Sequence, residues 1–188
     1  MAIKEIKAGI IGATGYAGVE LVRLLSGHPH VELAAISSVS FSGEELSKIY
    51  PNLRCSVDMT LDEGPQEMMN RCDVIFASLP HGLSQELAKD CVDRNIVFID
   101  LGADFRLENE DDYKTWYGGS FLSEELHKQA VYGLCELFRE EIKGARLIAN
   151  PGCYPTSVAL AMYPALKAGL IDTENIIIDS KSGVTGAG

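Results

Sequence analysis

The sequence has no long apolar run and little positive charge. Its apolar stretches are all shorter than the roughly 20 residues that cross a bilayer, and Met1–Glu5 lacks the apolar core of a secretory signal peptide. It has 16 Lys and Arg residues and 27 Asp and Glu residues, which gives a formal charge of −11 at pH 7. We therefore expect neither nucleic acid nor a membrane as a partner, while a local positive pocket for phosphate groups remains compatible with this charge.

Paired cysteines are also absent. The cysteines are odd in number and far apart, and no C-x-x-C pair occurs, so the sequence indicates neither a disulfide framework nor a zinc site. His28, His30 and His127 lack the spacing of metal ligands and are expected on the surface. We expect no metal, and a reducing cytoplasm as the location. The cysteines are Cys55, Cys72, Cys91, Cys135 and Cys153.

What the sequence does contain is a regular alternation of strand-like and helix-like segments. With 188 residues and 46% hydrophobic content, the chain can form one domain and part of another. Such alternation is typical of an α/β fold with a doubly wound parallel sheet covered by helices. Expected strands are 6–11, 31–36, 73–79, 96–101 and 146–149, and expected helices are 19–25, 83–94 and 157–167. Residues 40–71 are predicted as a polar loop and helix region, and 107–128 as an irregular excursion.

A glycine-rich turn follows the first expected strand. Its residues are Gly12, Ala13, Thr14, Gly15, Tyr16, Ala17 and Gly18, and an amphipathic helix comes next. Gly12 permits a tight turn, Gly15 lets the backbone approach a pyrophosphate, and Gly18 lets the helix pack closely on the strand. The free amides at the helix start suit a phosphate. The segment predicts a Rossmann-like dinucleotide site, and the alternative is a purely structural glycine turn.

The end of the second strand bears on which dinucleotide binds. NAD sites commonly place an acid about 20 residues past the glycine turn, against the ribose hydroxyls. Glu32 has that spacing, but it stands at the wrong end of its strand, and the position that faces the ribose is Ser37 or Ser38. A small hydroxyl leaves room for a 2′-phosphate and sets no carboxylate against it. We therefore expect NADP (NADPH) rather than NAD.

Two further loops follow expected strands, and ligands of open α/β sheets bind at such carboxyl ends. Asp100–Arg106 forms one of them, where Arg106 either holds a carboxylate or phosphate of the substrate or makes a surface ion pair with nearby acids. The other loop consists of Leu79, Pro80, His81 and Gly82, and we assign it to cofactor binding. Its histidine, His81, is either a base or a residue that caps or packs the turn.

The last expected strand leads to a cysteine. Cys153 stands in Asn150-Pro151-Gly152-Cys153-Tyr154-Pro155-Thr156, just ahead of a helix-like run. The amides and the dipole at a helix start favour an anion, and the thiolate is the reactive form of cysteine. Cys153 is therefore the candidate catalytic nucleophile. The alternative is a buried structural cysteine, which the flanking Asn-Pro-Gly and Tyr-Pro-Thr disfavour.

Together these residues resemble the N-acetyl-γ-glutamyl-phosphate reductases, relatives of aspartate-semialdehyde dehydrogenase. The resemblance runs over essentially the whole chain and departs from the family pattern at Cys135, where the family usually has proline. It implies NADPH as the cofactor, Cys153 as the acyl-accepting nucleophile, and an acyl phosphate as the substrate. The segments that carry it are Gly12–Gly18, Leu79–Gly82 with Ser84, Asp100–Arg106, Tyr132–Leu134 with Glu136, Asn150–Thr156 and Ser182–Gly188.

The resemblance also implies further contacts and a domain plan. Ser182 and Gly183 would contact the cofactor, Asn150 the substrate, and the complete enzyme would be a homo-oligomer. We expect a dinucleotide-binding domain over 1–148 and the start of a truncated α+β catalytic domain over 149–188. The family's acid/base histidine follows the last segment, so the chain is expected to be an inactive fragment. Alternatives are reduction of aminoadipyl or aspartyl phosphate, and a dinucleotide-binding module without turnover.

Overall fold

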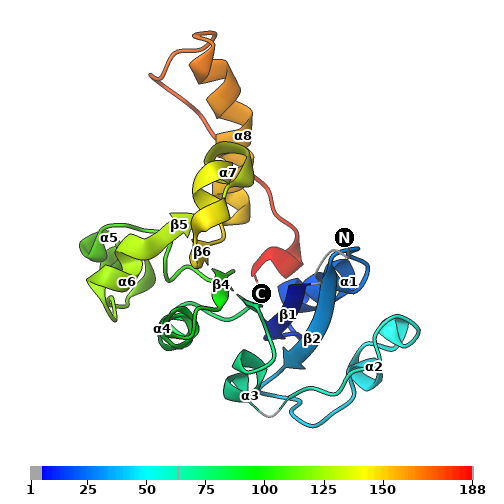
Figure 1. Cartoon of the computed structure of the whole chain (residues 1–188). Helices are drawn as coiled ribbons and strands as arrows, with labels where there is room; N and C mark the ends of the chain where they lie inside the picture. The colour runs from blue at the N-terminus through cyan, green and yellow to red at the C-terminus, as the bar shows by residue number, and fades with distance from the viewer. Residues whose placement is uncertain (1–5, 63, 188) are drawn as a thin grey trace, which may run out of the picture.

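The computed structural model describes residues 6–62 and 64–187. Residues 1–5, on which the signal-peptide argument rests, and Gly188 of the last family segment lie outside the described residues. Within them, six parallel strands form one sheet in the order β2-β1-β3-β4-β6-β5 (Figure 1). The strands are β1 (Ile6–Ile11), β2 (Val31–Ser37), β3 (Val74–Ala77), β4 (Val97–Asp100), β5 (Ala130–Tyr132) and β6 (Leu147–Ala149).

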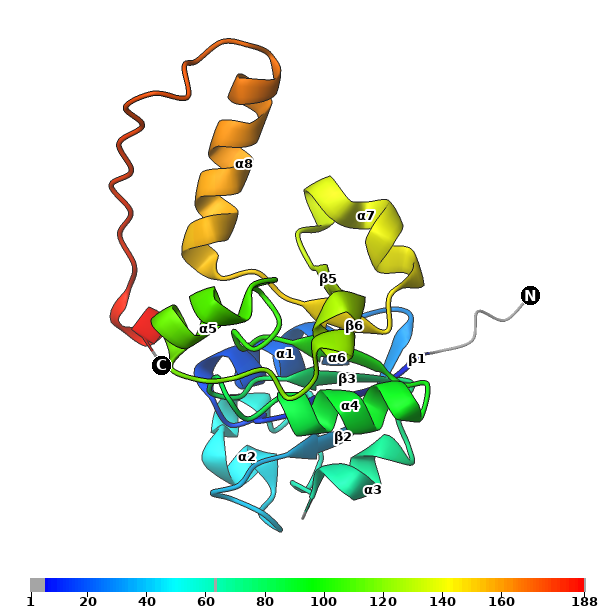
Figure 2. The same cartoon turned by 90° about the vertical axis from the view of Figure 1, so that its left-hand side faces the viewer.

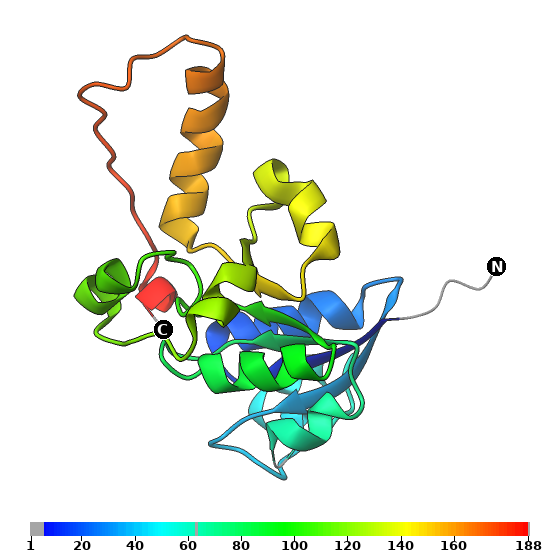
Figure 3. The same cartoon turned by 60° about the vertical axis from the view of Figure 1, so that its left-hand side comes forward.

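Helices cover both faces of the sheet, as predicted for a doubly wound fold. Figures 2 and 3 show α4 and α1 on opposite sides of the strands. The strand order reverses at β1, between β2 and β3, which is where this architecture forms a dinucleotide crevice. The helices are α1 (Tyr16–Ser26), α2 (Leu46–Ile49), η1 (Pro51–Leu53), α3 (Pro65–Met69), α4 (Gln85–Asp93), α5 (Glu110–Tyr117), α6 (Glu124–Gln129), α7 (Cys135–Gly144), α8 (Cys153–Lys167) and η2 (Val184–Ala187).

Two apolar cores follow from this layering. Alternate residues of a strand point to opposite faces, so Ile10 and Ile11 of β1 enter different cores. Ile10 packs in the core that includes Val22 of α1, and Ile11 in the core that includes Ala88 and Cys91 of α4. Burying apolar surface on both faces is the main force that holds the sheet and thereby fixes where its strands end.

The excursion 107–128 is more regular than predicted, because it contains α5 and α6. Side-chain caps start both helices: Asn109 accepts from the amides of Asp111 and Asp112, and Ser123 accepts from the amide of Leu126. Sequence reasoning also gave no strand at β5 and no helix at α7. Both lie between this excursion and β6, and β5 is an edge strand of the sheet that was not predicted from the sequence.

The chain beyond β6 packs little. Helix α8 projects away from the sheet, and the segment after it runs back toward the sheet (Figures 1 and 2). None of residues 150–186 is buried. The interior of the described structure therefore lies in the sheet and its covering helices, within residues 6–149.

Candidate active site

The glycine turn between β1 and α1 is built as the sequence predicts. The amides of Gly12 and Ala13 donate to the Ser37 main-chain oxygen at 3.0 and 2.9 Å. Gly12 has φ +83°, and a Cβ there would lie 2.2 Å from the Ser78 oxygen, while a Cβ on Gly18 would lie 2.0 Å from the Gly12 oxygen. Both positions need glycine for steric reasons. Gly15 does not, since its Cβ would meet only the Gly12 oxygen at 3.6 Å.

The serines at the end of β2 lie beside this turn. Ser38 Oγ and Thr14 Oγ1 are 2.7 Å apart, and the Tyr50 hydroxyl donates to the Thr14 main-chain oxygen at 2.7 Å. Ser37 and Ser38 are only 5% and 6% exposed. The structure thus joins the two predicted halves of the dinucleotide site, and the serine side chains lie mostly under the surface rather than out in solvent.

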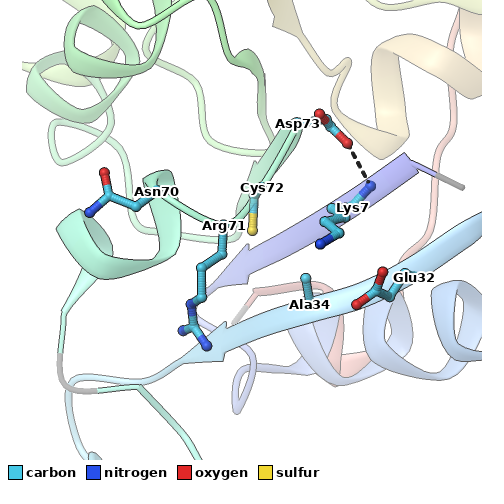
Figure 4. Close-up of a pocket in the computed structure, with 7 residues that line it drawn as sticks. All are labelled: Lys7, Glu32, Ala34, Asn70, Arg71, Cys72 and Asp73. Atoms are coloured by element: carbon cyan, nitrogen blue, oxygen red, sulfur yellow. Dashed lines mark hydrogen bonds between the residues drawn. The ribbon is translucent and has the colours of Figure 1, made fainter.

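Glu32 lies at the opposite end of β2, as the sequence predicts. It lines a pocket of about 560 Å³ between the amino-terminal parts of β1, β2 and β3 (Figure 4). There the Lys7 amide donates to Asp73 Oδ2 at 3.0 Å, and burial raises the pKa of the Cys72 thiol to about 11. This pocket is remote from the carboxyl ends of the strands, where ligands of such sheets bind. We therefore do not assign Glu32 to the dinucleotide site.

The loop after β3 is largely exposed, and hydrogen bonds to a buried side chain hold it. Pro80 and His81 are exposed, and the His81 ring centroid lies 5.7 Å from that of Tyr117. Asp104, fully buried in the next loop, accepts hydrogen bonds from the Gly82 amide at 2.5 Å and the Ser84 amide at 2.9 Å. The structure therefore connects the two predicted strand-end loops directly.

Asp104 and its neighbours form a buried polar cluster that sequence reasoning missed. Its carboxylate also accepts from the Tyr113 hydroxyl at 2.9 Å, and its main-chain oxygen accepts from His127 Nε2 at 2.8 Å. The expectation that His127 lies on the surface is wrong: it is 9% exposed and stacks on Phe121 with ring centroids 3.4 Å apart. His28 and His30 are exposed as expected. Only tertiary packing distinguishes His127 from them.

Asp100 is the second buried acid of this region. Its Oδ1 accepts from the Gly102 amide at 3.0 Å, while its Oδ2 has no hydrogen-bond partner among the described residues. Burial raises the pKa of this carboxyl, and the Ser84 hydroxyl and the Gly102 amide oppose that rise. Ser84 Oγ, buried as well, lies near the carboxyl but outside good hydrogen-bond geometry. Two polar atoms are thus buried side by side without full partners.

Arg106, in the loop after β4, bonds both to its own loop and to the loop after β6. Its Nε donates to the Asn150 main-chain oxygen at 2.8 Å, and its Nη2 donates to the Leu101 main-chain oxygen at 2.7 Å. Nη1 lies beside Gly152, because a Cβ built there would be 3.2 Å from it. The surface ion pair considered as an alternative is not present among the described residues. Substrate binding by Arg106 and Asn150 stays a prediction.

Cys153 is the first residue of α8, directly after β6. Gly152 precedes it in an extended conformation, φ −70° and ψ 157°, and the Thr156 amide donates to the Gly152 oxygen at 3.0 Å. The helix thus begins at Cys153, before the start expected at residue 157. Its thiol is exposed, so the alternative of a buried structural cysteine does not hold in this structure. A helix start and an accessible thiol are the conditions for a nucleophile.

These segments share one edge of the sheet. The glycine turn, the 79–82 loop, Asp100–Arg106 and the Cys153 segment follow β1, β3, β4 and β6, which are neighbours in a parallel sheet. Ser182 and Gly183 are exposed, and the hydrogen bonds that they make within the described chain are local. Their cofactor contact stays a prediction.

No described helix is both long and apolar enough to cross a membrane. In the part of the chain that the structure describes, no group of three or more His, Cys, Asp or Glu side chains is arranged to hold a metal ion.

Comparison with known proteins identifies the family. A model of the semialdehyde dehydrogenase NAD-binding domain matches residues 7–145, and a model of the semialdehyde dehydrogenase dimerisation domain matches residues 153–188. The chain belongs to the semialdehyde dehydrogenase family. The resemblance stated from the sequence motifs is therefore confirmed at the level of this family.

Individual proteins that are similar to the chain add to this comparison. N-acetyl-gamma-glutamyl-phosphate reductases of Clostridium botulinum and Brachyspira hyodysenteriae are 56% and 53% identical to the chain, each over 97% of it. The chain spans about half the length of these curated relatives, 53% and 54%. A crystal structure of aspartate semialdehyde dehydrogenase with NADP from Candida albicans matches 89% of this chain and 48% of its own, at 18% identity and a TM-score of 0.62. That likeness shows the fold.

Proposed function

We propose that the chain is the dinucleotide-binding and nucleophile-bearing part of an NADPH-dependent reductase. It acts on N-acetyl-γ-glutamyl phosphate and yields N-acetylglutamate 5-semialdehyde, a step of arginine biosynthesis. The observation that carries the proposal is the exposed Cys153 at the first position of α8, on the same sheet edge as the glycine turn. Identity above 50% to reductases of that name supports the choice of substrate.

The residues at the glycine turn suit a dinucleotide. Steric crowding explains why positions 12 and 18 are glycine, whereas no crowding among the described residues explains the glycine at position 15. Open space above Gly15 at the start of α1 is what a pyrophosphate needs to approach main-chain amides. Ser38, bonded to Thr14, would face the ribose and leave room for a 2′-phosphate. NADPH would supply a hydride, the two-electron reductant of the reaction.

The chain's own residues supply the covalent chemistry. The Cys153 thiolate forms a bond to the acyl carbonyl carbon, the bond from that carbon to the phosphate oxygen breaks, and inorganic phosphate leaves. The acyl group is then a thioester on Cys153. Addition of a hydride to the thioester carbon and of one proton to its oxygen would give a thiohemiacetal, which collapses to the aldehyde and regenerates the thiol. Amides at the start of α8 would stabilise the oxyanion of the tetrahedral intermediates.

We further propose a domain boundary near residue 149. Residues 1–148 would bind the dinucleotide, and 149–188 would begin a catalytic domain; the lack of buried residues within 150–186 supports this division. The match of 153–188 to a dimerisation-domain model supports a homo-oligomer. All five cysteines are free, which supports a reducing compartment such as the cytoplasm.

The test is substrate-dependent oxidation of NADPH by a full-length protein that carries this chain. N-acetylglutamyl phosphate should give steady turnover, and aminoadipyl and aspartyl phosphates should give much lower kcat/KM. Preference for either of the other acyl phosphates would overturn the substrate assignment. Tight binding of NADPH without oxidation in the presence of any of the three would show a binding module instead of an enzyme.

A further inference from the structure

One buried side chain, Asp104, connects the loop after β3 to the loop after β4. Two of the three donors to its carboxylate are the main-chain amides of Gly82 and Ser84. Ser84 is also the N-cap of α4, and its side chain makes no capping hydrogen bond. The Asp104 carboxylate, from a distant part of the chain, accepts from the Ser84 amide at this helix start instead. The proposed chemistry gives this acid no part.

Packing holds the loop that Asp104 binds only at Leu79, which lies against the core, and at the His81 ring, which lies beside Tyr117. Pro80, His81, Gly82 and Leu83 are all exposed. Gly82 has φ +86°, and no atom of the described residues lies within 4 Å of the place where its Cβ would be. A segment with so few contacts opens easily unless its main chain is held. Hydrogen bonds to a carboxylate are stronger than those between neutral groups, so the bonds to Asp104 are the main restraint on this loop.

The segment that carries Asp104 is also bonded to the segment that carries Cys153. Arg106 donates to the Asn150 main-chain oxygen, close before Cys153 in the chain. The loops after β3 and β4 also touch near Gly102, where a Cβ would lie 3.3 Å from the Leu79 oxygen. A single short segment is therefore bonded on one side to the predicted cofactor loop and on the other side to the segment that presents the thiol.

We propose that Asp104 is a positioning residue that fixes the 79–82 loop, and with it the nicotinamide half of bound NADPH, relative to Cys153. The inference rests on the proposed function. If the adenosine half lies at Ser38 and the pyrophosphate at the glycine turn, the other half of the dinucleotide reaches the ends of β3 and β4. Asp104 is fully buried, so it acts through the loop and not by touching either reactant.

Asp104→Asn distinguishes the anchoring of the loop by hydrogen bonds from the effect of the negative charge on NADPH binding. Its carboxamide has one oxygen and one NH₂ group, so whichever way it turns, the NH₂ group faces the amide of Gly82 or of Ser84. We expect amide exchange at these two positions to accelerate and the Kd for NADPH to rise about tenfold. Alkylation of Cys153 by iodoacetamide should keep its rate, because the bonds of Arg106 remain. Removal of a negative charge alone would instead tighten binding of the anionic NADPH.

Tyr113→Phe is the matched control, measured in the same full-length protein. It removes the third donor to the same carboxylate and leaves both main-chain bonds in place. We expect lower stability, unchanged exchange at Gly82 and Ser84, and a Kd for NADPH within about twofold of the unmodified protein. Equal effects of the two substitutions on NADPH binding would overturn the proposal, since Asp104 would then be a structural residue only.

Gly82→Ala gives a second route if Asp104→Asn does not fold. A methyl group there meets no atom but strains the main chain at positive φ, so it disturbs the loop without altering the buried acid. It should also raise the Kd for NADPH, and an unchanged Kd would contradict the proposal. Failure of the unmodified protein to bind NADPH would instead contradict the proposed function. Unchanged exchange at Gly82 and Ser84 in Asp104→Asn would refute the anchoring itself.

Discussion

Thr14 Oγ1 and Ser38 Oγ lie 2.7 Å apart, so the glycine turn and the end of β2 are joined by a side-chain hydrogen bond. This contact places Ser38 next to the glycine turn that leads into α1. If the adenosine ribose lies there, the residue at position 38 decides whether a 2′-phosphate is accepted.

Ser38→Asp should therefore shift the preference from NADPH toward NADH. A carboxylate there would repel the 2′-phosphate and bond to free ribose hydroxyls. Ser37→Asp tests the other serine in the same way. Ser38→Asn is the control, because it has nearly the same shape without the charge. Fluorescence titration with both cofactors measures the ratio of Kd values; equal affinity of the unmodified protein for both cofactors would show that the serines do not select NADPH.

Gly18→Ala and Gly15→Ala should have opposite consequences. A Cβ on Gly18 would overlap the Gly12 oxygen, so we expect a loss of about 3 kcal/mol or more in the free energy of unfolding. A Cβ on Gly15 meets no such obstacle, and its substitution should cost less than about 1 kcal/mol while weakening binding of the dinucleotide pyrophosphate. Urea unfolding and NADPH titration of both variants check this. Full NADPH affinity in Gly15→Ala would contradict the pyrophosphate role.

Asp100→Asn should stabilise the protein near neutral pH. Burial raises the folded-state pKa of Asp100 above its ordinary value of 3.8, so the contribution of this carboxyl to stability falls as pH rises from that value through the folded-state pKa. Asparagine stays neutral, and its Nδ2 can donate to the unpartnered Ser84 Oγ. We expect a gain of about 1 kcal/mol at neutral pH that shrinks toward acid pH, where Asp100 is protonated as well.

Urea unfolding over a series of pH values measures this effect. Asp111→Asn is the control, since the Asp111 side chain is 92% exposed and its substitution should change little. A gain that is independent of pH, or a loss at neutral pH, would show that the buried carboxyl is not the cause.

The isolated chain should self-associate. Large apolar side chains stay exposed on the segment after α8, among them Ile177 at 92% and Val184 at 94%. Apolar patches of this kind promote association. Ile177→Lys should lower the weight-average mass in sedimentation, whereas Val39→Lys, at a residue 95% exposed on the dinucleotide-binding part, should not. A monomer at high concentration would contradict this expectation.

The sheet could be predicted because apolar runs and glycine turns are local signals. Ile6–Ile11 followed by Gly12 is recognisable without knowledge of its neighbours, since the strand needs apolar residues and the turn needs positive φ. Helix α5 was missed because its residues are charged and aromatic and show no apolar stripe. The local signals of its two ends are Asn109, whose side chain caps the N-terminus, and Gly118, the C-cap at φ +74°.

The site could be predicted only in part. Cys153 and the glycine turn carry their own local geometry, and the structure has both as expected. Asp104 and His127 could not be assigned from spacing, because their roles arise from the contacts of Asp104 with Gly82 and of His127 with Asp104, partners more than 20 residues away in the chain. The contact of Arg106 with Asn150 is likewise a product of neighbouring strands β4 and β6.

Acceptance of the acyl group by Cys153 is the step on which the proposed function depends. A full-length protein that carries this chain should be mixed with N-acetylglutamyl phosphate in the absence of NADPH, quenched in acid, digested and examined by mass spectrometry, with Cys153→Ser as the control. We predict an N-acetylglutamyl group on the peptide that contains Cys153, its release as the semialdehyde on addition of NADPH, and no adduct in the serine variant. Acylation of another residue, or turnover by Cys153→Ser above about a tenth of the unmodified rate, would contradict the role of Cys153 as nucleophile, since a tenfold loss is only about 1.4 kcal/mol of barrier.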